Sequence, residues 1–445
     1  MTNKLWCDSL RLYAANPFFA LLRVCLSLIF AGPMIGHAEE LLAPITWEQL
    51  RVMTGKSNLE IQLARQLIAT AQADLERAGL KPNPTLTLSD SSWKLNRSPL
   101  GYGADISARI DQTLERGGKL KLRQKQSTAL LEAAQLDVLR TERLVMARLG
   151  SAIVDLESAR LKLKASREIS LTLERAAAIA RQRLGAGDLS EVAADRVSTD
   201  AIRALNDITV AQGDLLDAEL SLKLLVGADR LSARDMQSID VRTLPSPPSA
   251  EASLRADGVS IKVDPRTPEL LAAKRREAAA RAGVELANSQ RTRDVSVGVQ
   301  VEKQSYTGGA FLGVSLSLPL LIFNDYAAEI RRANSDQMSA EIETNRLESQ
   351  IQSEQTRLRY GLRLATEREA RLRDQALPVA VRNAKAVEFS FQRGAASVLE
   401  VLDAERTLRT VQIEVINARA DRLRTATAFA LILDPSLLGQ DLQIP

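Results

Sequence analysis

The chain contains very little histidine and cysteine. Among 445 residues there is one histidine, His37, and there are two cysteines, Cys7 and Cys25, all within the first 38 residues. If that segment is removed, no side chain remains for a disulfide, a thiol or imidazole nucleophile, or the usual soft-metal site. We therefore predict no cofactor, no resident metal and no enzymatic activity for the mature chain.

Aromatic residues, prolines and excess charge are also scarce. Aromatic residues make up 4% of the chain, and no proline occurs between Pro99 and Pro245. Compact globular cores in a chain of this size usually contain more aromatic residues. Proline is a strong helix breaker, so a long stretch without it allows uninterrupted helices. The composition therefore favours long packed helices. Lys and Arg number 59 against 55 Asp and Glu, with the signs interspersed, which argues against a nucleic-acid partner.

Residues 1–38 have the features of an export signal. Lys4 and Arg11 precede an apolar stretch from about Val24 to Ile35, and small residues follow at Gly36 and Ala38. The apolar stretch is shorter than the roughly 20 residues that span a bilayer. We expect a cleaved signal peptide, with an uncleaved anchor as the alternative.

An internal repeat organises the rest of the chain. Gly187-Asp188-Leu189-Ser190 aligns with Gly394-Ala395-Ala396-Ser397 at an offset of about 207 residues, and each half has the same order of helix, two alternating runs, long helix, turn and long helix. The predicted organisation is a first repeat at 39–227, a connector at 228–266, a second repeat at 267–434, and a C-terminal tail at 435–445.

The long helical stretches have coiled-coil spacing. Ala201, Ile208, Leu215 and Leu222 follow each other at intervals of seven, which keeps one stripe facing a partner helix. Glycine-containing turns are the main interruptions. We therefore predict two helical hairpins, at about 118–227 with its tip at 185–190 and at about 325–434 with its tip at 393–397.

Alternating apolar and polar residues occur at about 85–114 and 294–320. Val295, Val297, Val299 and Val301 form the clearest run, and the period of two predicts strands with one apolar face. Each run is about ten residues long, as in a tilted membrane strand, although a soluble hairpin has the same pattern. Six of the eleven aromatic residues beyond position 38 lie in or beside these runs, as expected at a membrane interface: Trp93, Tyr102, Tyr306, Phe311, Phe323 and Tyr326.

Four strands cannot close a barrel by themselves. Open sheet edges leave backbone groups without partners in hydrocarbon, so the chain is expected to oligomerise. Three copies would close a twelve-stranded barrel and arrange the helices as a tube. The predicted fold is mainly α, with duplicated long helical hairpins and two β-hairpins per chain, forming a trimeric β-barrel continued by a tube of helices.

Three motifs carry a resemblance to a known family. Gln112 to Lys119 (QTLERGGK) is similar to the strand-to-helix motif of the CzcC-like heavy-metal branch. The second motif is Ser397 to Arg406, directly after the second turn, and the third, Lys81 to Leu86, resembles the family's entry into the first strand. Over the whole mature chain, the sequence resembles the outer-membrane factor (TolC-like) family of trimeric export ducts. The resemblance implies an outer-membrane β-barrel continued by a periplasmic α-barrel. It also implies docking to an inner-membrane pump, of the resistance-nodulation-division type, through a periplasmic adaptor.

The resemblance implies a passive efflux channel, with heavy-metal cations as substrate and most of the helical mass in the periplasm. A duct for drugs or other small molecules is the alternative, and a periplasmic coiled-coil adaptor without a pore is a further one. Adaptors usually have one helical hairpin flanked by compact β-domains, whereas this sequence predicts two helical hairpins and two strand pairs.

Several residues are candidates for specific roles. Glu400 and Asp403 are three apart on one helix face and match the family's acidic ring at the periplasmic aperture. Gly117 and Gly118 allow the change of direction from strand to helix. The residues expected at the adaptor-docking tips are Arg183, Gly187, Ser190, Arg393, Gly394 and Ser397.

Overall fold

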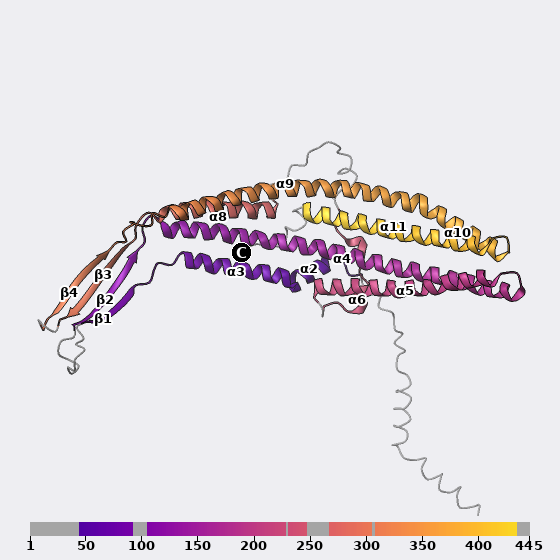
Figure 1. Ribbon diagram of the computed structural model, residues 1–445, viewed down its shortest axis with the longest axis horizontal. Coiled ribbons are helices and arrows are strands. Elements are labelled where there is room, and N and C mark those ends of the chain that lie inside the picture. Colours follow the sequence, from indigo (N-terminus) through magenta and orange to yellow (C-terminus); the bar gives the residue numbers. More distant parts are fainter. Residues whose placement is uncertain (1–43, 92–104, 228–229, 247–266, 305–307, 434–445) are drawn as a thin grey trace, which may run out of the picture. The chain divides into compact units, whose positions relative to one another are not determined.

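The computed structural model describes residues 44–91, 105–227, 230–246, 267–304 and 308–433 (Figure 1). Residues from Ile45 onward form one unit, to which all the following elements belong. The predicted signal peptide and C-terminal tail lie outside the described residues, as do most of the predicted connector and the turn between the first two strands.

The first repeat begins with two helices, continues with two strands and ends with a pair of long helices. Its elements are α2 (Trp47–Ser57), α3 (Leu59–Ala78), β1 (Thr85–Ser91), β2 (Asp105–Leu114), α4 (Lys119–Ala186) and α5 (Glu191–Val226). The longest helix, α4, has 68 residues, which corresponds to about 100 Å at about 1.5 Å per residue.

The second repeat has a similar order, with one helix before its strands. Its elements are α8 (Pro268–Ser289), β3 (Val295–Lys303), β4 (Ala310–Ser317), α9 (Ala327–Arg371), a π-helical turn η2 (Leu372–Ala376), α10 (Leu377–Gln392) and α11 (Val398–Leu433). Strand β4 ends before Leu318 and Leu320, which the alternation had placed in the strand. Pro319 explains the early end, because proline has no N–H for the strand ladder.

Pro378 lies in the first turn of α10, directly after the π-helical turn. The backbone stays helical here, because a π-helical turn widens it where the proline removes a hydrogen bond and crowds the preceding turn.

The four strands form one antiparallel sheet in the order β1-β2-β3-β4. Ala108 of β2 pairs with Leu88 of β1 and with Val301 of β3, so apolar side chains share one face. Arg109 pairs with Thr87 and Gln300 on the opposite, polar face. The large apolar side chains of the first face are exposed, as expected for a surface that has no cover within the described part of the chain.

Helix α4 is the central element of the helical part and packs against α3, α5, α8 and α11, while α9 packs against α8 and α11 (Figure 1). One hydrophobic cluster gathers around Trp47, Leu149 and Leu431, and a second lies nearer the helical turns around Val197 and Phe391. The two halves of the chain therefore share their cores.

Part of the connector belongs to the first cluster, which the sequence did not indicate. The prediction was a polar connector at 228–266, but its described residues include a short helix α6 (Ala233–Gln237) and a 3-10 turn η1 (Val241–Thr243). Ile239 forms a parallel bridge with Ile45. Five apolar residues of the described connector are buried, and they pack the connector against the core: Leu231, Met236, Ile239, Val241 and Leu244.

Candidate functional site at the helical tips

The first tip reverses the chain between α4 and α5. Gly187 has a positive φ of 82°, and its N–H donates to the carbonyl of Leu184 at 3.0 Å. The left-handed conformation favours glycine, which explains this residue at the end of α4. Ser190 caps α5, because its hydroxyl accepts from the N–H of Ala193 at 3.3 Å.

The second tip, between α10 and α11, also has a glycine with positive φ and a capping serine. Gly394 has a φ of 80°, and its N–H donates to the carbonyl of Phe391 at 3.0 Å. Ser397 and Glu400 form a reciprocal cap, with the Glu400 N–H donating to the Ser397 hydroxyl at 3.3 Å and the Ser397 N–H donating to the Glu400 carboxylate at 2.6 Å.

The cap also influences the charge of Glu400. Hydrogen bonds from the backbone and then the side chain of Ser397 lower the pKa of Glu400 below its ordinary value. Glu400 and Asp403 are both exposed. The carboxylate of Glu400 is thus ionised at neutral pH and held at the start of α11, while that of Asp403 lies on the next turn.

Arg183 connects the two tips within one chain. Its guanidinium donates to the carbonyl of Phe391 and lies 4.6 Å from the centre of the Phe391 ring. Phe391 is itself buried in the second hydrophobic cluster. Arg393, which directly follows α10, is exposed and stacks on Phe389 of that helix at 4.0 Å. The two predicted tip arginines therefore differ, because only Arg183 bridges the hairpins.

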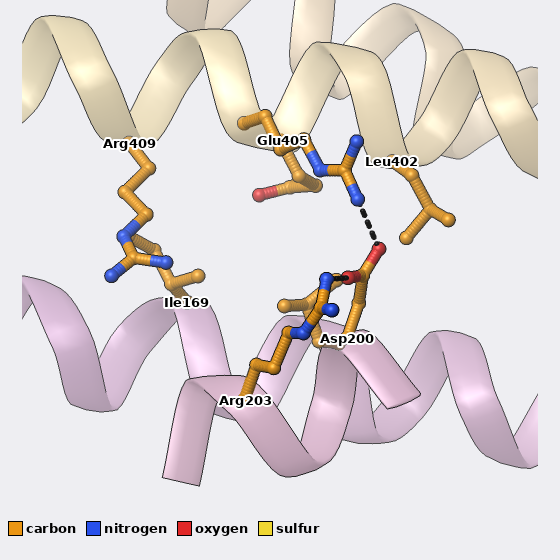
Figure 2. Close-up of a pocket in the computed structure, with 8 residues that line it drawn as sticks. Ile169, Asp200, Arg203, Leu402, Glu405 and Arg409 are labelled. Carbon is orange, nitrogen blue, oxygen red and sulfur yellow. Dashed lines mark hydrogen bonds and ion pairs between the residues drawn. The ribbon is translucent and has the colours of Figure 1, made fainter. Parts of the chain in front are cut away.

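A charged cluster below the tips was not predicted from the sequence. Asp200 of α5 is only 9% exposed and accepts from Arg406 of α11 at 2.7 Å, and Arg203 lies 3.5 Å away (Figure 2). Arg409 and Asp207 pair in the same way at 2.5 Å. The Asp200–Arg406 and Asp207–Arg409 ion pairs join the first helical hairpin to the second.

Glu405 lies in the same cluster without an ion pair among the described residues. It is buried, and it lines a cavity of about 340 Å³ together with Leu402, Arg406 and Arg409 (Figure 2). Burial, and then the negative charge of Glu388, raise the pKa of Glu405 above its ordinary value. The side chain is therefore easier to protonate than an exposed glutamate.

Gly117 and Gly118 lie at the opposite end of α4, where β2 becomes helix. Both have positive φ, 73° and 71°. A Cβ on Gly117 would lie 2.8 Å from the Cβ of Thr292. Beside them, Asp294 accepts from the buried Lys119 ammonium at 2.8 Å and from the Arg116 N–H at 2.9 Å, so the junction is fixed by backbone shape and by an ion pair.

The described residues contain no group of histidine, cysteine or carboxylate side chains arranged to hold a metal ion. Among the same residues, no helix combines the length and apolar character needed to span a membrane.

Comparison with known proteins identifies the class. Residues 56–228 and 263–433 match the outer membrane efflux protein family, and the chain belongs to that family. The cobalt-zinc-cadmium resistance protein CzcC of Cupriavidus metallidurans is 24% identical over 404 residues, which cover 89% of this chain and 91% of CzcC.

Solved structures agree on the fold. The outer membrane protein VceC from Vibrio cholerae is similar with a TM-score of 0.70 at 17% identity, covering 87% of this chain and 96% of VceC. The outer-membrane channel OprN matches with a TM-score of 0.70 at 19% identity, covering 87% and 90%. The family and the mainly α fold predicted from the sequence are thus confirmed, and the chain belongs with efflux proteins rather than enzymes.

Proposed function

We propose that the chain is the outer-membrane channel of a tripartite efflux system. It passively conducts substrate across the outer membrane from an inner-membrane pump of the resistance-nodulation-division type and a periplasmic adaptor. The observation that carries the proposal is the four-stranded sheet with an exposed apolar face, continuous with helices as long as 68 residues. Such a sheet suits a lipid environment, and such helices can reach far from it.

The sheet has two open edges, β1 and β4, and in hydrocarbon both need backbone partners. If β4 of one copy pairs with β1 of the next, three copies close a twelve-stranded barrel, and no edge remains. We therefore propose a homotrimer. The trimer places the sheet in the outer membrane and most of the helical mass in the periplasm.

Heavy-metal cations are the proposed substrate. The similarity to CzcC, a cobalt-zinc-cadmium resistance protein, favours this class, while drugs or other small molecules remain the second candidate. A strain that lacks the gene should become more sensitive to cobalt, zinc or cadmium, with dyes and detergents as comparison. Sensitivity to dyes alone would favour the second candidate.

The tips and the acidic pair have proposed roles within this assembly. Glu400 and Asp403 line the aperture, where a threefold repeat of exposed carboxylates attracts cations and repels anions. The adaptor docks on the tips, where Gly187, Ser190, Gly394 and Ser397 set the shape of the two turns. Arg393 is the exposed tip arginine, whereas Arg183 acts from within the chain.

Channel formation is tested directly with the purified full-length protein. Extraction from outer membranes should require detergent and yield a trimer by native mass spectrometry, and the trimer should conduct ions in planar bilayers. A monomer that is soluble without detergent would overturn the proposal.

The aperture is tested by neutralising Glu400→Gln and Asp403→Asn together. Glutamine still supports the reciprocal cap with Ser397, so a fall in the cation selectivity of the conductance would come from lost charge. The matched control neutralises the exposed Asp74 and Glu76 of α3. Unchanged selectivity in the first variant would remove these residues from the aperture.

A further inference from the structure

The segment between β4 and α9 exposes large apolar side chains. Leu318, Leu320 and Ile322 are all exposed, and Phe323 is 101% exposed, without contact to the described part of the chain that would cover it. Contiguous exposed apolar residues of this kind mark an interaction surface rather than a solvated loop. We call residues 318–323 the apolar segment.

The apolar segment continues the apolar face of the sheet. Leu312, Val314 and Leu316 of β4 pair with Val301, Val299 and Val297 of β3 on that face, and Leu318 and Leu320 keep the same spacing of two. The segment also lies at the end of the sheet that joins the helices, because α9 begins at Ala327. It therefore extends the proposed lipid-facing surface toward the periplasm.

Hydrogen bonds fix the base of the apolar segment. The side chain of Asn324 accepts from the Tyr326 N–H at 2.9 Å, and that of Asp325 accepts from the Ala327 N–H at 3.0 Å. Arg291 donates to the carbonyl of Asp325 at 3.1 Å. Tyr326 has a φ of 62°, which is strained for a residue with a side chain. These contacts fix the turn that directly follows the exposed Phe323.

Exposed basic residues surround the same end of the sheet. They precede β1 and β3 and follow β2 and β4, and the antiparallel register brings these four ends together. None of them forms an ion pair with a described residue, and we call them the basic collar: Lys81, Arg116, Lys121, Arg293 and Arg331.

The acidic residues near the basic collar are too few to neutralise its positive charge. Asp294 is paired with Lys119 and Glu115 with Arg123. Over residues 81, 115–123, 291–294 and 318–332, the basic residues outnumber the acidic ones by nine to four. The junction therefore combines an apolar projection with a positive surface.

We propose that the apolar segment and the basic collar form an interfacial anchor that binds anionic phospholipid at the periplasmic leaflet of the membrane. The apolar side chains enter the boundary between headgroups and acyl chains, and the collar attracts the phosphates. The inference rests on the proposed placement of the sheet in the outer membrane. It adds a lipid partner and a device that sets the depth of the barrel.

A second copy of the chain covers the apolar segment less well. Pairing between β4 and a neighbouring β1 would bring Lys81-Pro82-Asn83-Pro84 to this place, which offers no large apolar side chain except the preceding Leu80. Backbone pairing also lies in the plane of the sheet, whereas the side chains of an apolar face point away from that plane.

The anchor is tested on the full-length protein in detergent by counting bound phosphatidylglycerol and phosphatidylcholine with native mass spectrometry. Arg293→Gln with Arg331→Gln should weaken phosphatidylglycerol binding about tenfold and leave phosphatidylcholine binding unchanged. Ile322→Ser with Phe323→Ser should weaken the binding of both lipids. The control, Lys164→Gln with Arg167→Gln, changes two exposed basic residues of α4 outside the collar and should bind as the wild type does.

Unchanged phosphatidylglycerol binding in the collar variant would overturn the proposal. Loss of the oligomer in the Ile322 and Phe323 variant, with lipid binding retained, would also overturn it and assign the segment to a contact between copies. The proposed channel function is tested separately and fails if the wild type neither forms a trimer nor conducts ions. Lipid binding can still be measured in that case, because it is counted on whichever oligomer the wild type forms.

Discussion

Asp200 of α5 and Arg406 of α11 form a hydrogen-bonded ion pair of 2.7 Å although 206 residues separate them in the chain. This separation nearly equals the repeat offset of about 207 residues. Nearly equivalent positions of the two repeats thus carry opposite charges and meet between the hairpins. The duplication therefore gives each chain an internal contact between hairpins of similar sequence pattern.

The ion pair predicts the effect of Asp200→Ala on the tips. The substitution removes a charge-assisted hydrogen bond, but both arginine partners are largely exposed and can return to water, so the cost should be about 1–2 kcal/mol. Amide hydrogen exchange should accelerate in α5 and α11 near the tips. Asp207→Ala is the matched control, because the carboxylate of Asp207 is more exposed than that of Asp200, so its loss should cost no more than about 1 kcal/mol. Equal exchange in both variants would show that the Asp200 pair has no special role.

Local patterns explain which elements were predictable. The alternation at 294–320 predicted strands, and glycine turns in proline-free stretches predicted helical hairpins, because these signals act within a few residues. The preference for glycine after a helix and for serine before one is equally local. In the structure, the tip glycines follow the ends of helices and the tip serines cap the starts of the next helices.

Contacts between distant segments were not predictable in the same way. Nothing in the local sequence distinguishes Asp200, which is buried, from other acidic residues on the same helix. The contact of Arg183 with Phe391 was not predicted, because it joins two tips that lie 208 residues apart in the chain. The buried connector residues, such as Met236, were missed because the surrounding prolines and polar residues are typical of a loop.

Gly117 and Gly118 should differ in their tolerance of alanine. Gly118→Ala places a side chain at a φ of 71° in open space, so the cost should be that of the left-handed conformation, about 1–2 kcal/mol. Gly117→Ala has the same conformational cost, and its methyl group would lie 2.8 Å from Thr292, so the loss should be larger. Urea denaturation of the detergent-solubilised protein measures both. Equal losses would mean that Thr292 moves aside freely.

Arg143 is expected to be essential for packing between the repeats. Its side chain is 2% exposed, and it donates to the carboxylate of Glu269 at 3.1 Å and to the carbonyl of Leu431 at 3.2 Å. Arg143→Ala leaves a buried carbonyl and a partly buried carboxylate without this partner, which should cost about 3–5 kcal/mol. Arg148 lies on the same helix as Arg143 and forms an exposed pair with Glu60 of α3, so Arg148→Ala should cost about 0–1 kcal/mol.

Thermal unfolding of the two variants, followed by circular dichroism of the helices, provides the measurement. The melting temperature should fall markedly for Arg143→Ala and little for Arg148→Ala. A small change for both would indicate that water enters and replaces the contacts of Arg143.

Glu405 should make the helical tips less stable as pH rises. Burial raises the pKa of Glu405 above its ordinary value of 4.5, so the folded protein holds a proton that the unfolded chain has already released. Stability is then highest below the ordinary pKa and falls as pH rises through the raised pKa, because the buried carboxylate must ionise. Glu405→Gln removes this cost and should raise the melting temperature at pH 7.5.

The pH dependence separates this effect from a simple change in packing. Near pH 4, wild type and Glu405→Gln should melt at similar temperatures, since Glu405 is largely protonated there. Glu388→Gln removes the second cause of the raised pKa and should give a smaller gain at pH 7.5. Arg406 and Arg409 line the same cavity. A loss of stability in Glu405→Gln at pH 7.5 would mean that these arginines stabilise an ionised Glu405 and that the direction of the pKa shift is wrong.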